Sequence, residues 1–286
     1  MTSRDFLNHF RRKALFCPKC HSPMRRAERG GRAFAECVRA PECPGARGLP
    51  VEYVEDRQEW RREYGDILSR LGEIHQKFAL VNEYQPLNDP TPQRVLDMGC
   101  AYGHYLRILR ILNPKMECFA ADLSRDACES IEREGLVQKA FWQDIGAPIP
   151  LEDGGLDWMY CFDVIEHVPL EESLCALFQE ARRLLKPGGR FFLFFPNFNQ
   201  QTKLALLFLG GSEGNIGGDH CNMLTAGDAM RLASPLLAVE HVRFVNPILN
   251  QRRAIPLLHG LFSPHLRLAY NVFMVLRKNP ATPPGS

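Results

Sequence analysis

The chain has 286 residues, of which 45% are hydrophobic and 24% charged, and its formal net charge is +2. These values are typical of a globular protein with a sizeable core and exclude an intrinsically disordered chain. The opening residues lack an apolar leader, and no uninterrupted apolar run reaches the ~18 residues of a membrane span, so we expect a cytoplasmic protein without such a span.

The first fifty residues differ from the rest of the chain. They hold eleven Lys or Arg against four acids, a net charge of +7, which leaves −5 for the remainder. They also hold four cysteines, spaced C-x2-C and C-x5-C. Four thiolates can close a tetrahedral zinc shell, and so small a module needs such a staple, although paired disulfides are an alternative. The sequence therefore predicts a zinc ribbon over residues 1–50, with the ligands Cys17, Cys20, Cys37 and Cys43.

The segments CPKCHSPM, RGGRAFAEC and PEC of this ribbon resemble the zinc ribbons at the C-terminus of bacterial type I topoisomerases. Those ribbons bind single-stranded DNA through basic and aromatic faces. Within residues 17–43 Phe34 is nearly the only aromatic residue, but arginines are plentiful. A nucleic acid, a protein partner or solvent could each face the basic residues, which are Arg25, Arg26, Arg29 and Arg32.

Beyond the ribbon, residues 51–84 carry apolar residues at three- and four-residue intervals, which predicts one amphipathic helix, and the proline-rich residues 85–93 predict a linker. From Arg94 onward, short apolar runs alternate with helical stretches. Strands are expected at 94–99, 116–123, 136–144, 156–165, 191–197, 237–245 and 269–276, and helices at 103–112, 124–135, 170–189 and 225–234.

Continuous apolar strands separated by helices indicate a parallel sheet covered on both faces. The predicted fold is therefore α/β, with a doubly wound, mostly parallel, seven-stranded Rossmann-like sheet over residues 94–279. A connecting helix and linker occupy 51–93, and a disordered tail occupies 280–286. The glycine-rich residues 198–221 are interpreted as a mobile lid.

The segment VLDMGCAYGHYL combines a strand, a glycine turn and the start of a helix. Gly99 and Gly103 allow the backbone to approach a ligand closely, and the helix N-terminus offers unpaired N–H groups. A dinucleotide site requires a third glycine, but Ala101 and the following residues supply none. The carboxylate of Asp97 would repel a pyrophosphate, and it suits a ligand with an ammonium and a sulfonium group and no phosphate.

This segment is followed by FAADLS, WQD, LDWMYCFDVIEHVP and ARRLLKPGGRFFLFFPN. In this order and spacing, over about residues 94–200, the motifs resemble class I S-adenosylmethionine-dependent methyltransferases, in their small-molecule, type 11-like branch. The resemblance implies an enzyme with S-adenosylmethionine as its cofactor. The chain departs from the family pattern at Ala101, where glycine is commonest.

The resemblance also implies roles for residues at the ends of four strands. The glycine turn would frame the amino-acid end of the cofactor, the next strand end would bind both ribose hydroxyls through a carboxylate, and the third would flank the adenine. The fourth would lie at the methyl donor. The implied residues are Asp97, Gly99, Cys100 and Gly103 at the turn, Asp122 and Leu123 at the ribose, Asp144 and Ile145 at the adenine, and Phe162 or Asp163 at the methyl group.

A D-x-x-E-H group, Asp163, Glu166 and His167, follows the fourth strand, and His220 follows the glycine-rich segment. These four residues could hold a second divalent metal, Mg²⁺ or Mn²⁺, that activates an acceptor hydroxyl. Alternatively, His167 or His220 acts as a plain general base, or proximity alone suffices. The candidate catalytic residues are Asp163, His167 and His220.

One motif bears on the acceptor. Enzymes that methylate exocyclic amines of bases often carry Asn/Asp-Pro-Pro-aromatic where this chain has CFDVIEHVP. This difference argues against such an acceptor, and the resemblance to the small-molecule branch implies methyl transfer to an oxygen or nitrogen atom, less readily to carbon, of a small-molecule metabolite. Two alternatives stay open, which are an RNA methyltransferase that uses the ribbon to recognise its substrate and a non-catalytic cofactor-binding scaffold.

Overall fold

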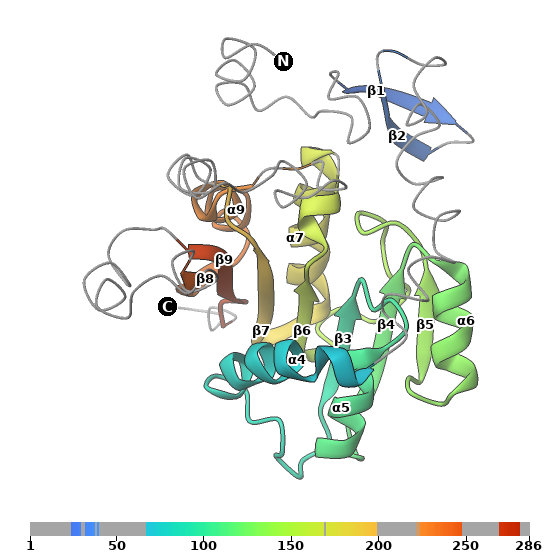
Figure 1. Ribbon diagram of the computed structural model, residues 1–286, viewed down its shortest axis with the longest axis vertical. Helices are drawn as coiled ribbons and strands as arrows, with labels where there is room; N and C mark the ends of the chain where they lie inside the picture. The colour runs from blue at the N-terminus through green and yellow to red at the C-terminus, as the bar shows by residue number, and fades with distance from the viewer. Residues whose placement is uncertain are drawn as a thin grey trace, which may run out of the picture.

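The computed structural model describes residues 24–29, 32–37, 39, 67–168, 170–198, 222, 224–247 and 269–280. Most of these residues form a seven-stranded sheet with helices on both faces (Figure 1). In spatial order the strands are β5 (Lys139–Trp142), β4 (Glu117–Asp122), β3 (Arg94–Met98), β6 (Leu156–Phe162), β7 (Leu185–Pro196), β9 (Ala269–Arg277) and β8 (Ala238–Pro247).

The first five strands in this order are parallel, and β9 runs antiparallel to both of its neighbours. The strand order reverses direction between β3 and β6, so the sheet is doubly wound around that point. The predicted mostly parallel, seven-stranded α/β sheet is confirmed for the described residues.

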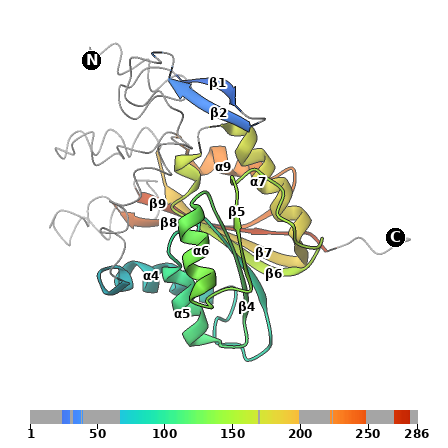
Figure 2. The ribbon, with the colours of Figure 1, turned by 90° about the vertical axis from the view of Figure 1, so that its right-hand side faces the viewer.

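Helices cover the two faces of the sheet (Figure 2). On one face lie α4 (Ile67–Asn82), α5 (His104–Leu112) and α6 (Arg125–Arg133), and on the other lie α7 (Glu171–Leu184) and α9 (Ala226–Ala233). A short 3₁₀ helix, η1 (Ile165–His167), follows β6.

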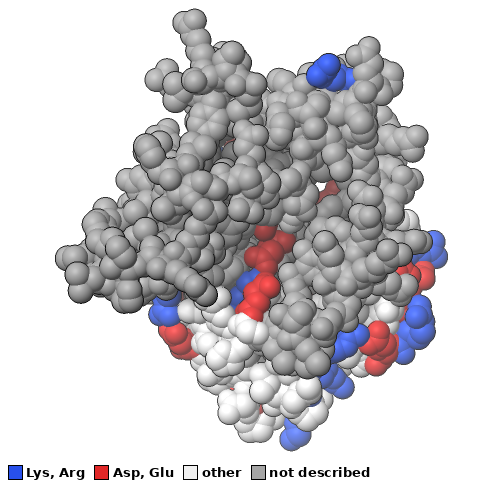
Figure 3. Space-filling view, viewed as in Figure 1, with Lys and Arg blue, Asp and Glu red and all other residues white. Residues whose placement is uncertain are grey.

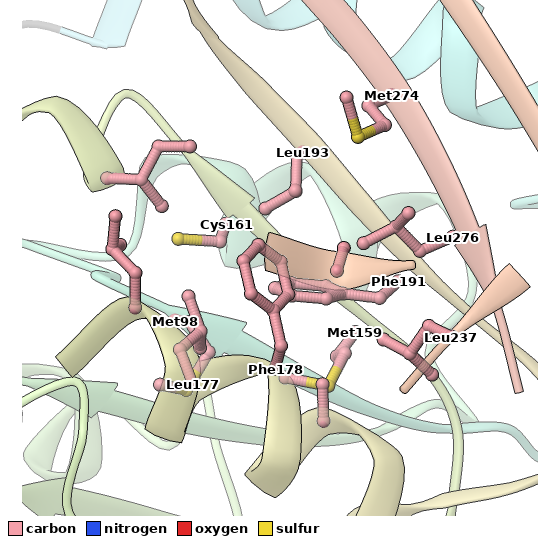
Figure 4. Packing of buried hydrophobic residues seen from close by; sticks show 14 of the residues in the cluster. Met98, Met159, Cys161, Leu177, Phe178, Phe191, Leu193, Leu237, Met274 and Leu276 are labelled. Atoms are coloured by element: carbon pink, nitrogen blue, oxygen red, sulfur yellow. The ribbon is translucent and has the colours of Figure 1, made fainter. Parts of the chain in front are cut away.

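The strands alternate their side chains between the two helical layers, as strand geometry requires. In β6, Trp158 and Tyr160 pack with the layer of α4, α5 and α6, whereas Met159 and Cys161 pack with α7. Figure 4 shows the α7 side, where Phe178 of the helix lies among the strand residues. Apolar side chains fill the interface between the sheet and the helices on each face, and their burial is the main contribution to the stability of the fold.

The helix α7 is shorter than predicted, and the strand β7 that follows it is longer. The helix expected over 170–189 ends at Leu184, and β7 already begins at Leu185, which pairs with Leu156. Pro187 cannot continue a helix, and the backbone around Gly188 pairs with Lys278 in both directions, at 2.9 Å each. Pro187 is thus a local signal that the helix ends, whereas the start of the strand at Leu185 depends on pairing with Leu156, 29 residues earlier in the chain.

Two predicted strands are shorter than expected. The strand expected over 136–144 spans Lys139–Trp142, and the strand expected over 156–165 ends at Phe162. Asp163 adopts a φ of +54°, a left-handed conformation that ends the extended backbone.

The described part of the amino-terminal fifty residues is a two-stranded antiparallel hairpin, β1 (Met24–Arg29) and β2 (Arg32–Cys37). The predicted zinc ligands Cys17, Cys20 and Cys43 lie outside the described residues. The same holds for most of the predicted lid and for residues 281–286 of the predicted tail. Among the described residues, no helix is long and apolar enough to cross a membrane.

Candidate functional site

The carboxyl ends of β3, β4 and β6 meet at one edge of the sheet. Asp97 of β3 lies level with Ala120 of β4 and with Tyr160 of β6, so the residues that follow these strands are neighbours. Open parallel sheets bind ligands outside the carboxyl ends of their strands, at the point where the strand order reverses. The predicted turn, Asp122 and Phe162 all belong to this edge.

The turn between β3 and α5 has an unusual backbone. Gly99, Ala101 and Gly103 have φ values of +83°, +43° and +74°, all in the left-handed region. The N–H of Gly103 donates to the carbonyl of Cys100 at 2.9 Å, which closes the turn, and Gly103 is the N-cap of α5. Ala101 thus has a backbone conformation that glycine adopts at a lower cost in free energy. The turn forms with alanine at this position, where the family pattern has glycine most often.

The carboxylate of Asp122 organises this turn. One oxygen accepts the backbone N–H of Ala101 at 2.8 Å, and the other accepts that of Ser124 at 2.7 Å. Ser124 in turn caps α6 by accepting the N–H of Ala127 at 3.2 Å. The side chain of Asp122 is therefore fixed in position at the carboxyl end of β4.

Asp97 is buried beneath the turn, with 2% of its surface exposed. Burial raises the pKa of its carboxyl to about 8, the hydrogen bond from Tyr160 acts in the opposite direction, and the nearby charge of Asp122 adds to the rise. The hydroxyl of Tyr160 donates to Asp97 at 2.8 Å. Tyr160 was not among the predicted site residues, and the only available signal for it was its place opposite Asp97 on a neighbouring strand.

A raised carboxyl pKa makes the stability of the chain depend on pH. The folded state then binds a proton that the unfolded state releases above its usual pKa of 3.8, so stability falls as pH rises from about 4 to about 8. In urea unfolding of the ligand-free chain, we expect Asp97→Asn to remove a decline of up to ~1.4 kcal/mol per pH unit across this window. The exposed Asp126→Asn is the control, and equal slopes in wild type and Asp97→Asn would contradict the prediction.

The segment after β5 carries the predicted adenine residues Asp144 and Ile145. The N–H of Gln143 donates to the carbonyl of Asp122 at 3.0 Å, which ties this segment to the end of β4. Ile145 is half-buried and packs against the α7 side of the core. Both residues therefore follow directly on the edge that holds Asp122.

An exposed tryptophan lies beside these residues and was not singled out from the sequence. Trp142 has 49% of its surface exposed, its indole N–H donates to the carbonyl of Leu123 at 2.9 Å, and the guanidinium of Arg125 lies 5.5 Å from its ring centroid. An aromatic residue at the carboxyl end of a predicted strand was the available signal.

The segment after β6 touches the glycine turn. The N–H of Asp163 donates to the carbonyl of Phe194 at 2.8 Å, which holds the segment on β7. The side chain of Val164 lies so close to Gly99 that a Cβ at that position would overlap with it. Asp163 and the turn are therefore parts of one site.

A buried lysine of α4 completes this site. Lys77 is 1% exposed, its ammonium forms an ion pair with the carboxylate of Asp163, and it contacts Glu73 at 2.6 Å. It also lies 4.6 Å from the ring centroid of Phe194, with two further rings within 6 Å, those of Tyr105 and Phe162.

These neighbours favour the protonated, positively charged form of Lys77. Burial alone would lower its pKa, but the carboxylates of Asp163 and Glu73, together with Tyr105, outweigh burial, and the pKa of Lys77 lies above its usual value. Figure 3 shows the face of the molecule that Figure 1 presents, with acidic residues in red and a basic residue in blue near its middle. Lys77 lies between the apolar positions of the predicted helix, and no feature of that pattern indicates that its side chain is buried.

Glu166 and His167 belong to η1, beside Asp163. Glu166 is 2% exposed, and its carboxylate lies 4.0 Å from the His167 imidazole. The backbone of Asn222 donates to the carbonyl of Glu166 at 2.9 Å. No group of three or more His, Cys, Asp or Glu side chains in the described ranges could hold a metal ion, and His220 lies outside them, so the second metal site stays a prediction.

Comparisons with known proteins agree with this geometry. Residues 53–233 match a family model described as a methyltransferase domain. A protein in transposon TN4556 of Streptomyces fradiae is 31% identical over 113 residues, which are 38% of this chain and 32% of that protein. The ubiquinone biosynthesis O-methyltransferase of Chromobacterium violaceum is 25% identical over 203 residues, 64% of this chain and 76% of that enzyme. The chain thus spans about a third of the first relative.

The fold also resembles a solved structure. The geranyl diphosphate C-methyltransferase of Streptomyces coelicolor A3(2) superposes with a TM-score of 0.52 at 15% identity, over 74% of this chain and 82% of that one. Its crystal structure is a complex with Mg²⁺, geranyl diphosphate and S-adenosyl-L-homocysteine. At this identity the likeness concerns the fold alone.

Proposed function

The chain belongs to the methyltransferase-domain family, and on this premise we propose that it transfers a methyl group from S-adenosylmethionine to an oxygen or nitrogen atom of a small molecule. One observation carries the proposal. The carboxylate of Asp122, fixed by two backbone donors, stands beside a turn with three left-handed residues at the carboxyl edge of the sheet.

The residues at this edge fit S-adenosylmethionine. The two carboxylate oxygens of Asp122 can accept hydrogen bonds from two vicinal hydroxyls, and Gly99, which has no Cβ, lets the side chain of Val164 pack against the turn. Asp97 offers a buried carboxyl group whose ionised form an ammonium group would stabilise, and Trp142, with Ile145, offers apolar surface toward an adenine. When bound, S-adenosylmethionine supplies an electrophilic methyl group on a positively charged sulfur.

The contribution of the chain is orientation and proton handling. Asp163, next to the glycine turn, is assigned to accept a hydrogen bond from the acceptor hydroxyl or amine, because Lys77 holds its carboxylate in one position. His167, 11% exposed, is assigned as the base that removes the acceptor proton. The finer assignment of His220 and of a divalent metal rests on the D-x-x-E-H spacing alone.

Calorimetry and product analysis test this function. The full chain should bind S-adenosylmethionine and S-adenosylhomocysteine, and it should release S-adenosylhomocysteine when mixed with phenols, carboxylic acids or amines. Lack of binding to either compound would overturn the proposal. A methyl group recovered in total RNA, added as a further acceptor, would favour the RNA alternative, and binding without turnover on any acceptor would favour the scaffold.

For the amino-terminal module we propose a structural zinc ion held by Cys17, Cys20, Cys37 and Cys43. The hairpin supports this, because Met24 pairs with Cys37 and so the chain that follows the first cysteine pair starts beside the third cysteine. Elemental analysis of the full chain should give about one zinc per chain. Cys20→Ser should lose the zinc, whereas Cys175→Ser, a half-buried thiol of α7, should keep it.

A further inference from the structure

The Lys77 ammonium lies where methyl transfer would take place. It forms its ion pair with Asp163, and Asp163 precedes Val164, whose side chain packs on Gly99 of the cofactor turn. The ring of Phe162, assigned to the methyl donor, is 5.8 Å from the ammonium. A helix outside the parallel sheet therefore places a fixed positive charge at the carboxyl end of β6.

Burial of a charged ammonium costs free energy unless neighbouring groups compensate it. The structure compensates it with two carboxylates and three aromatic faces. Glu73 alone, one helical turn away on α4, would provide a surface partner. Asp163 adds a second carboxylate, which is 38% exposed and has a left-handed backbone.

We propose that Lys77 is a positioning residue of the methyl-transfer site, which fixes the carboxylate of Asp163 and offsets its negative charge beside the methyl donor. This inference rests on the proposed function. Transfer of the methyl group disperses and then removes the positive charge on sulfur. A bare carboxylate there would stabilise the ground state more than the transition state, and so would slow the reaction. The Lys77 ammonium offsets this effect and holds the carboxylate of Asp163 in place.

Two ligands that differ in one charge test the idea without a known acceptor. S-adenosylmethionine carries a positive sulfur and S-adenosylhomocysteine a neutral one, whereas their remaining groups are the same. In calorimetric titrations we compare two dissociation constants, that of S-adenosylhomocysteine divided by that of S-adenosylmethionine. Lys77→Met should raise this ratio roughly tenfold, as expected for the loss of a charge several ångströms away. A merely structural role would weaken both ligands equally.

Asp163→Asn gives an independent measurement. It leaves the ammonium uncompensated on that side and should lower the same ratio roughly tenfold, while asparagine tolerates the left-handed backbone. The double variant Lys77→Met/Asp163→Asn should return to the wild-type ratio. Lys77→Arg keeps the charge, so its ratio should also stay near the wild-type value, even where the larger head group weakens the binding of both ligands.

The matched control is a second lysine–aspartate pair, which joins the neighbouring strands β7 and β6. Lys186 contacts Asp157 at 2.6 Å, near the opposite end of β6. Lys186→Met should leave the ratio unchanged. An unchanged ratio in both Lys77→Met and Asp163→Asn, with both ligands still bound, would overturn the role of Lys77 alone, whereas a wild-type chain that bound neither ligand would overturn the proposed function as well.

Discussion

Asp122→Ala is expected to weaken S-adenosylmethionine binding by more than ~100-fold. The change removes the acceptor for the ribose hydroxyls, and hydrogen bonds to a charged group contribute ~1.5–3 kcal/mol each. It also removes the partner of the Ala101 and Ser124 N–H groups, so the turn that holds the amino-acid end of the cofactor loses its anchor. Calorimetric titration of the folded variant measures the effect.

Two further variants separate these contributions. Asp122→Asn keeps one carbonyl acceptor and should lose less affinity than Asp122→Ala. Glu129→Ala removes an exposed carboxylate of α6 that pairs with Arg125 and should bind the cofactor like wild type. Unchanged affinity in Asp122→Ala would refute the assignment of this edge as the cofactor site.

Gly99→Ala is expected to destabilise the chain and to abolish cofactor binding. The residue has a φ of +83°, which costs an alanine ~1–2 kcal/mol, and the added Cβ would overlap with Val164. Overpacking of this kind costs a further ~1–3 kcal/mol. Urea unfolding should therefore show a loss of about 2–5 kcal/mol in the free energy of unfolding.

Gly135→Ala is the matched control, because Gly135 has a φ of +67° and nothing within 4 Å of the added Cβ. It should show the backbone cost alone. The double variant Gly99→Ala/Val164→Ala removes the overlap and should recover part of the lost stability, whereas no recovery would place the cost entirely in the backbone.

The sequence alone determined the features that arise from local pattern. Alternating apolar strands and helices predicted the seven-stranded sheet, because each strand must bury both faces and each helix one. The glycines at 99 and 103 marked the turn, and Asp122 was recognised as a strand-end carboxylate. Each of these signals lies within a few residues of chain, so a single sequence suffices to show it.

Tertiary structure decided what depends on residues far apart in the chain. Leu185 became strand instead of helix because it pairs with Leu156, and Asp122 came to hold the turn because Ala101 lies beside it. Lys77 is the clearest case, since nothing in an amphipathic helix marks a charged residue as buried. Only the packing of α4 on the end of β6, 86 positions further on, gives that lysine its partner Asp163.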